Sequence, residues 1–331
     1  MTAISFSCAG LPALLMLAAC SAAFAGPEDA SAVTEYQRGV QYMNGDGVPQ
    51  DLRQAVIWLR KSADQGYGEA EYDLGTLYAK GDGIARDDQQ AIAWFRKAAA
   101  QGVTDAEYDL GVLFGREGAA QDLPQSVAWF TKAADAGNAD AEGQLGLMYQ
   151  LGNGGVAQNT QQAVLLYRKA AAAGRASAQT NLGMMYLTAA GVPQDVAEAT
   201  SLLHAAAAQR YPDAQYDIGV MYNKGVGVAR DPAQAARWFR QAADEGYAAA
   251  QYNLGLLYKK GDGVPQDLSQ AAAWLAKAAD QGNQFAQYNL GVAYLNGDGV
   301  AVDLAQAAEW FRKAAAQGNK DAERMLSQLN R

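Results

Sequence analysis

The sequence is poor in the residues that most often carry catalysis and cross-linking. Its 331 residues include two cysteines, Cys8 and Cys20, and one histidine, His204. Both cysteines precede Gly26, so the chain beyond that residue has no disulfide, thiol nucleophile or cysteine metal ligand. One histidine without a cysteine cannot supply the familiar catalytic triads or zinc sites. The sequence therefore predicts a non-enzymatic protein without catalytic, metal or cofactor sites, stabilised by packing.

Basic charge is also scarce. The chain has 26 basic and 35 acidic residues and a net charge of −9. This balance opposes the phosphate neutralisation that nucleic-acid binding requires. Half of the residues are hydrophobic, which is enough for a packed core. We expect no nucleic-acid partner, and the acidic bias favours a basic or extended segment of a partner protein.

The first 25 residues lack a long apolar run. They contain no charged side chain, and Leu11–Ala19 is apolar but much shorter than the roughly 20 residues of a spanning helix. This pattern predicts an export signal over residues 1–25. Two processing sites stay open. The sequence LAAC resembles a lipobox and ends at Cys20, the candidate lipidation site. The small residues before Gly26 instead match the cleavage rule of an ordinary signal peptidase. We expect a periplasmic protein or an outer-membrane lipoprotein, rather than a secreted one, with membrane contact only through that lipid.

The rest of the chain repeats one unit eight times. A marker glycine recurs at intervals of 35 to 37 residues, at Gly39, Gly75, Gly111, Gly146, Gly183, Gly219, Gly255 and Gly291. Self-similarity at this period indicates a solenoid. Each unit has two helical segments joined by a glycine-rich loop. We expect an all-α solenoid with a linker at 26–33, repeats at 34–69, 70–105, 106–140, 141–177, 178–213, 214–249, 250–285 and 286–321, and a capping helix at 322–331.

The second helix of each repeat follows an N-cap residue. The cap positions are Asp51, Asp87, Asp122, Asn159, Asp195, Asp231, Asp267 and Asp303. A glutamine or glutamate stands three residues later and predicts a capping box that reaches back to the backbone N–H of the cap. A calcium site is the alternative, but no loop has the alternating ligands and closing glutamate of an EF-hand. We therefore interpret these residues as structural.

The tryptophans all share one position, seven residues after the cap. They are Trp58, Trp94, Trp129, Trp238, Trp274 and Trp310, and leucine fills this position in the fourth and fifth repeats. Clustered aromatic rings could form a sugar-binding platform. A fixed position on the alanine-rich side of the second helix favours core packing instead.

The first helix of each repeat has a face that does not belong to the core. On a helical wheel of the second repeat, the core residues Ala70, Leu74 and Tyr78 fall on one side. Tyr72 falls on the opposite side, and Asp73 flanks it. Tyrosine offers rigid contact area, and the neighbouring polar residue can bond a peptide backbone. The candidate partner-binding residues are Tyr72, Asp73, Tyr108, Asp109, Asn181, Tyr216, Asp217, Tyr252, Asn253, Tyr288 and Asn289.

The complete motif resembles the SEL-1-like repeat, a relative of the tetratricopeptide repeat. It reads Ala-x-Tyr-x-Leu-Gly-x-x-Tyr, Gly-x-Gly-Val, Asp, then Ala-x-x-Trp-x-x-Lys-Ala-Ala. The resemblance implies a right-handed α-solenoid whose first helices line a concave face. It also implies an exported adaptor that binds proteins in a bacterial envelope complex. A peptidoglycan or carbohydrate binder, with or without hydrolytic activity, is the alternative.

The fourth and fifth repeats depart from this motif. Gly143 and Thr180 replace tyrosine, and Arg210 replaces a helix-ending glycine. These changes reflect either sequence drift with repacking, which we favour, or a hinge or docking point. His204 takes a position that holds arginine in five other repeats, and we expect it at the solvated surface.

Overall fold

The computed structural model describes residues 27–118 and 121–329, and every regular element in these ranges is a helix. The expected export signal and Cys20 lie outside the described residues. The first helices of the repeats, with the C-terminal helix, are α2 (Pro27–Asn44), α4 (Gly68–Lys80), α6 (Thr104–Gly115), α8 (Ala139–Leu151), α10 (Ala176–Thr188), α12 (Pro212–Lys224), α14 (Ala248–Lys260), α16 (Gln284–Asn296) and α18 (Lys320–Leu329). The second helices are α3 (Leu52–Asp64), α5 (Asp88–Ala100), α7 (Leu123–Asp135), α9 (Thr160–Ala172), α11 (Val196–Ala208), α13 (Pro232–Asp244), α15 (Leu268–Asp280) and α17 (Leu304–Ala316).

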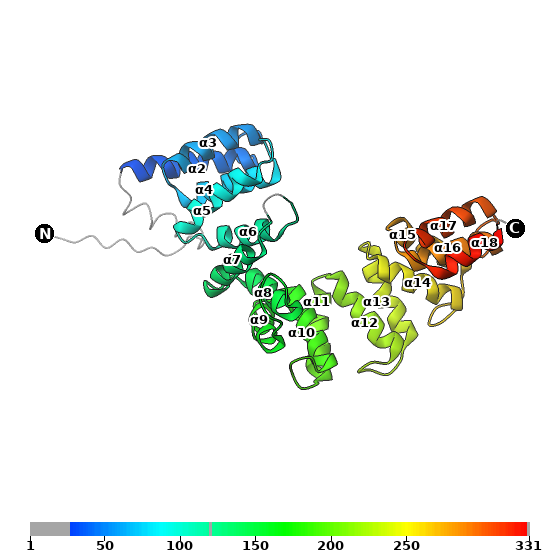
Figure 1. Cartoon of the computed structure of the whole chain (residues 1–331). Coiled ribbons are helices and arrows are strands. Elements are labelled where there is room, and N and C mark those ends of the chain that lie inside the picture. Colours follow the sequence, from blue (N-terminus) through cyan, green and yellow to red (C-terminus); the bar gives the residue numbers. More distant parts are fainter. Residues whose placement is uncertain (1–26, 119–120, 330–331) are drawn as a thin grey trace. The chain divides into compact units, whose positions relative to one another are not determined.

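The helices form an α-solenoid that divides into two compact units. The first unit ends at Gln158 and contains α2 to α8, and the second begins at Asn159 and contains α9 to α18. Within each unit, every helix packs on the next one along the chain (Figure 1). The division falls between the two helices of the fourth repeat, one of the two repeats that depart from the motif.

From α4 on, the first helices begin about two residues before the expected repeat boundaries. The first one differs, because α2 begins at Pro27 and the stretch expected as a linker at 26–33 is helical from that residue. The boundary of the second repeat was placed at its first core residue, Ala70, whereas α4 begins at Gly68. The preceding residues form an exposed first turn, which hydrophobic periodicity does not reveal. The same offset applies to the C-terminal helix, which begins at Lys320 and ends at Leu329.

The marker glycines allow the two helices of a repeat to approach closely. A Cβ atom on Gly75 would lie 2.7 Å from the ring of Phe95, which is itself buried in the core. Gly111 meets Phe130 in the same way, at 2.6 Å. Leucine takes the place of phenylalanine opposite Gly39, Gly183 and Gly255. Glycine therefore recurs inside the first helix because a phenylalanine or leucine of the second helix occupies the space of its missing side chain.

The N-cap prediction is confirmed in all eight second helices. In each, the cap side chain accepts a hydrogen bond from a backbone N–H of the first turn. The expected capping box is wrong. The N–H of Asp87 donates instead to the carbonyl oxygen of Tyr78 in α4, at 3.0 Å, and Asp51 and Asp231 bond to Tyr42 and Tyr222 in the same way. This bond ties the two helices of a repeat together and leaves the third-position glutamine free to point elsewhere.

The tryptophan position belongs to the core, as expected. Trp94, Trp274 and Trp310 are buried, and the other three are half-buried. A lysine ammonium lies over one face of the ring, 3.8 Å from its centre for Lys97 on Trp94 and 3.9 Å for Lys277 on Trp274. These cation–π contacts cover ring surface that stacking on a sugar would need.

His204 differs from the expectation of a solvated side chain. Its ring is half-buried and meets Trp238 of the next repeat edge-on, with 5.4 Å between ring centres. Its Nδ1 lies 2.8 Å from the carbonyl oxygen of Thr200, so Nδ1 carries the proton of this hydrogen bond. The contact across the repeat boundary explains the difference, because no pattern within one repeat reveals it.

Replacing Ala189 by glycine is expected to raise the free energy of unfolding by about 0.5–1 kcal/mol. Ala189 ends α10 with a φ of 57°, where glycine ends α4, α8, α12, α14 and α16. Glycine removes the left-handed strain but adds freedom to the unfolded chain. Urea unfolding followed by circular dichroism measures the change. Ala190→Gly is the matched control and should destabilise the protein, since Ala190 does not have a positive φ.

Candidate partner-binding face

The eleven candidate residues all lie on first helices and are all half-buried. Four belong to the first unit and seven to the second. We call this set the tyrosine face. It consists of Tyr72, Asp73, Tyr108, Asp109, Asn181, Tyr216, Asp217, Tyr252, Asn253, Tyr288 and Asn289.

Four of the five tyrosine rings of this face are held against aromatic residues of the core, and the fifth, Tyr252, lies near the exposed Phe285. Tyr72 packs on Phe95 with 5.7 Å between ring centres, and Tyr108 packs on Phe130 at 5.6 Å. In the second unit, Tyr216 and Tyr288 pack on phenylalanines of α13 and α17 at 5.7 and 5.8 Å. One ring face is thus fixed by the core, and the side chain needs little further ordering to contact a partner.

In the first unit, a tyrosine of one repeat bonds the aspartate of the next. The hydroxyl of Tyr36 donates to Asp73, and the hydroxyl of Tyr72 donates to Asp109. Burial raises the pKa of Asp73 to about 6 and also raises that of Asp109, while the hydrogen bond from tyrosine partly offsets each increase. Burial and the nearby carboxylates raise the pKa of both tyrosines. The structure thus brings Tyr72 and Asp109 together as a pair.

In the second unit, Asp217 has a different environment because Thr180 replaces tyrosine in the preceding repeat. The Thr180 hydroxyl donates to Ala176 of its own helix, at 2.8 Å. Burial, and then the charge of Asp213, raise the pKa of Asp217 to about 6. Asn181 instead bonds Tyr167 of α9.

The last two repeats carry amides in place of carboxylates on this face. Asn253 donates from Nδ2 to the carbonyl oxygen of Ala249, and Asn289 donates to that of Phe285, both at 2.9 Å. Each amide is therefore oriented by its own helix. The remaining N–H and the side-chain oxygen can serve a partner backbone.

Sequence reasoning missed several neighbours of the tyrosine face. Tyr247 precedes α14, donates to Asp213 at 2.9 Å and lies 5.2 Å from the ring of Tyr216. Phe285 is 54% exposed and lies 6.2 Å from the ring of Tyr252. The available signal was the residue before the first helix, which is aromatic at Tyr67, Tyr211 and Tyr247.

No group of three or more His, Cys, Asp or Glu side chains within 27–118 and 121–329 is arranged to hold a metal ion. Among the helices that the structure describes, none has the length and apolarity needed to cross a membrane.

A family model places the chain among known proteins. The Sel1 repeat matches eight times, over residues 33–67, 68–103, 104–138, 139–174, 176–211, 212–247, 248–283 and 284–319. The chain belongs to the Sel1 repeat family. The matched segments after the first begin at or next to the observed starts of the first helices.

Solved Sel1-repeat structures agree with this assignment. A Sel1 repeat protein from Oxalobacter formigenes is 36% identical, with a TM-score of 0.73 over 96% of this chain and 91% of the other. The protective antigen c5321 of uropathogenic Escherichia coli, which has the same repeat fold, is 35% identical, with a TM-score of 0.65 over 91% and 72% of the two chains. The search of curated proteins finds no match. Sel1-repeat proteins generally act as scaffolds for protein–protein interaction and are typically non-enzymatic.

Proposed function

We propose that this Sel1-repeat chain is an exported scaffold that binds other proteins through its tyrosine face, in a bacterial envelope complex, and that it catalyses no reaction. The observation that carries the proposal is the half-buried tyrosines and their polar neighbours, which lie on α4 and α6 in the first unit and on α12, α14 and α16 in the second. Rigid aromatic contact area and oriented hydrogen-bonding groups are the features that peptide-binding surfaces use. A tyrosine with a polar neighbour recurs in the second, third, sixth, seventh and eighth repeats, which suits an extended segment better than one compact ligand.

The acidic part of the face supports a basic partner. Asp73, Asp109 and Asp217 are half-buried carboxylates, and burial is the main cause of the raised pKa of each. Burial disfavours the charged form, so a cation of the partner beside one of these carboxylates would stabilise its charge. In the last two repeats, amides replace these carboxylates and Phe285 is exposed. Within the second unit, a segment that carries a basic residue near Asp217 and apolar residues near Phe285 would match both compositions.

Removing the face in the last two repeats is expected to abolish partner capture. The variant Tyr252→Ala, Asn253→Ala, Tyr288→Ala, Asn289→Ala should lower recovery of partners at least about tenfold, since central aromatic contacts each contribute about 2 kcal/mol or more. Capture of the tagged protein from cells, with quantitative mass spectrometry, measures this loss.

Two controls keep this test interpretable. Asn253→Ala with Asn289→Ala keeps the ring contacts and should lower capture while the thermal midpoint is retained. Arg237→Ala with Arg312→Ala changes exposed residues of second helices and should leave capture intact. Unchanged capture by a folded fourfold variant would refute the assignment.

Mass spectrometry of the mature amino terminus tests export. A diacylglyceryl group on Cys20 indicates a lipoprotein, and a free Gly26 indicates a soluble exported protein. An intact leader contradicts export.

A further inference from the structure

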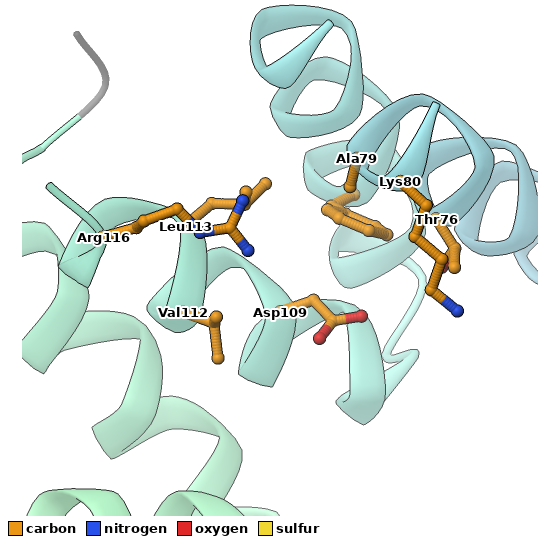
Figure 2. A pocket seen from close by; sticks show the side chains of 8 residues that line it. Thr76, Ala79, Lys80, Asp109, Val112, Leu113 and Arg116 are labelled. Atoms are coloured by element: carbon orange, nitrogen blue, oxygen red, sulfur yellow. The ribbon is translucent and has the colours of Figure 1, made fainter. Parts of the chain in front are cut away.

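A hollow of about 140 Å³ opens between the C-terminal halves of α4 and α6 (Figure 2). Phe95, Val112 and Leu113 supply apolar lining, and Lys80, Asp109 and Arg116 supply charge. The hollow lies wholly within the first unit and adjoins the tyrosine face through Asp109. Its size suits one side chain of a partner.

Two residues of the second repeat that line the hollow differ from their equivalents in other repeats. Thr76 takes a position that is valine, leucine or methionine in every other repeat, at Val40, Val112, Leu147, Met184, Val220, Leu256 and Val292. Ala79 takes a position that is larger in every other repeat except the third, at Met43, Gly115, Gln150, Leu187, Asn223, Lys259 and Leu295. Threonine is close to valine in size, so the small side chain of Ala79 is what leaves the space between α4 and α6 unfilled, and Thr76 makes its lining more polar.

The charges around the hollow are arranged as two cations and one carboxylate. Figure 2 shows Lys80 and Arg116 on opposite sides, with Asp109 between them. Both cations are exposed and end successive first helices. Asp109 accepts the hydrogen bond of Tyr72 and is attracted by Lys80. The lining thus has two cations and one carboxylate, and Asp73 and Asp105 lie near enough to act on Lys80 and Asp109.

We propose that this hollow binds the C-terminal residue of a partner protein. The terminal carboxylate lies between Lys80 and Arg116, the backbone N–H of that residue donates to Asp109, and its apolar side chain packs on the apolar lining. This inference rests on the proposed function, because it names a subsite of the tyrosine face.

The cations, the carboxylate and the apolar lining of the hollow together distinguish a C-terminal residue from an aspartate or glutamate side chain as the ligand. In a terminal residue, the carboxylate and the apolar side chain diverge from one Cα atom, and the N–H donor is one bond away. An aspartate or glutamate side chain carries its carboxylate at the tip and has no apolar group left for Phe95 and Leu113. The proposed ligand is thus a terminal residue of the leucine or valine type.

Fluorescence polarisation with two matched peptides tests the proposal. Both are fluorescein-labelled glycine–serine peptides that end in leucine, one with a free carboxylate and one with a C-terminal amide. The free acid should bind at least about tenfold more tightly than the amide, since hydrogen bonds to charged groups are the strong ones. Lys80→Gln and Arg116→Gln should each weaken binding of the free acid about three- to tenfold at low salt.

Two further variants test the shape of the hollow and the sign of the charge on its ligand. Ala79→Met fills the hollow with the residue that the first repeat has as Met43, so the fold should persist while binding is lost. Asp109→Asn keeps an acceptor for the N–H and removes like charge, so it should strengthen binding of the free acid about threefold. A cation site would show the opposite change.

Equal binding of acid and amide, or unchanged binding by a folded Ala79→Met variant, would overturn the proposal. The failure is separable from that of the proposed function, because the partner-capture test uses residues of α14 and α16 in the other unit. Capture that depends on Asn253 and Asn289, together with equal binding of acid and amide, would reject only the terminal-residue site.

Discussion

Replacing Gly299 by alanine is expected to lower the free energy of unfolding by about 3 kcal/mol or more. Gly299 lies in the loop after α16 with a φ of 77°. A Cβ atom there would lie 2.0 Å from the carbonyl oxygen of Leu268, at the start of the second helix of the preceding repeat. The substitution therefore combines left-handed strain with a collision against backbone, which cannot rotate away.

Gly47 provides the matched control for this prediction. It has the same loop position in the first repeat and a φ of 74°, but nothing lies within 4 Å of its ideal Cβ atom. Gly47→Ala should cost only the strain of the left-handed conformation, about 1 kcal/mol. Urea unfolding followed by circular dichroism gives both values. Equal losses would contradict the conclusion that this loop glycine is required by packing between repeats.

Replacing Asp217 by asparagine is expected to stabilise the protein by about 2 kcal/mol at pH 7.5 and to have little effect near pH 4. The folded pKa of Asp217, about 6, lies above the unfolded value near 3.9. The folded state thus binds the proton more tightly, so this group adds stability as the pH falls from about 6 toward 4. Its charge opposes folding at higher pH. Asparagine already occupies this position at Asn181, Asn253 and Asn289.

The reciprocal variant is Asn253→Asp. It places a carboxylate in the same position of the seventh repeat and should lower stability at pH 7.5 more than at pH 4. Urea midpoints of wild type and both variants at the two pH values isolate the contribution of this position. The same midpoint shift at both pH values for Asp217→Asn would contradict the role assigned to burial of the charge.

The fold could be predicted from the sequence because the same pattern of glycine, N-cap and core residues recurs from repeat to repeat. Marker glycines and caps such as Asp87 depend on contacts within one repeat, and the tryptophan position follows from its fixed place on the alanine-rich side of the second helix. These expectations agree with the structure. The capping box failed because the N–H of the cap is bonded to a carbonyl of the other helix. A pattern of three residues cannot reveal a bond between helices.

The candidate site was less predictable because its geometry arises between repeats. The pairing of Tyr72 with Asp109 and the edge-on contact of His204 with Trp238 both join residues of successive repeats. The hollow beside Lys80 depends on the relative sizes of residues at equivalent positions. Such features require the orientation of one repeat on the next, which the repeat period alone does not specify.

Site-specific photo-crosslinking in cells tests the central claim most directly. A benzophenone amino acid replaces Tyr252 on the tyrosine face or, in a matched chain, Arg237 on an exposed side of a second helix. Binding through the tyrosine face predicts that Tyr252-position crosslinks to a partner protein dominate and that the Arg237 position yields few. Crosslinks that form from the Arg237 position and not from the Tyr252 position would contradict it.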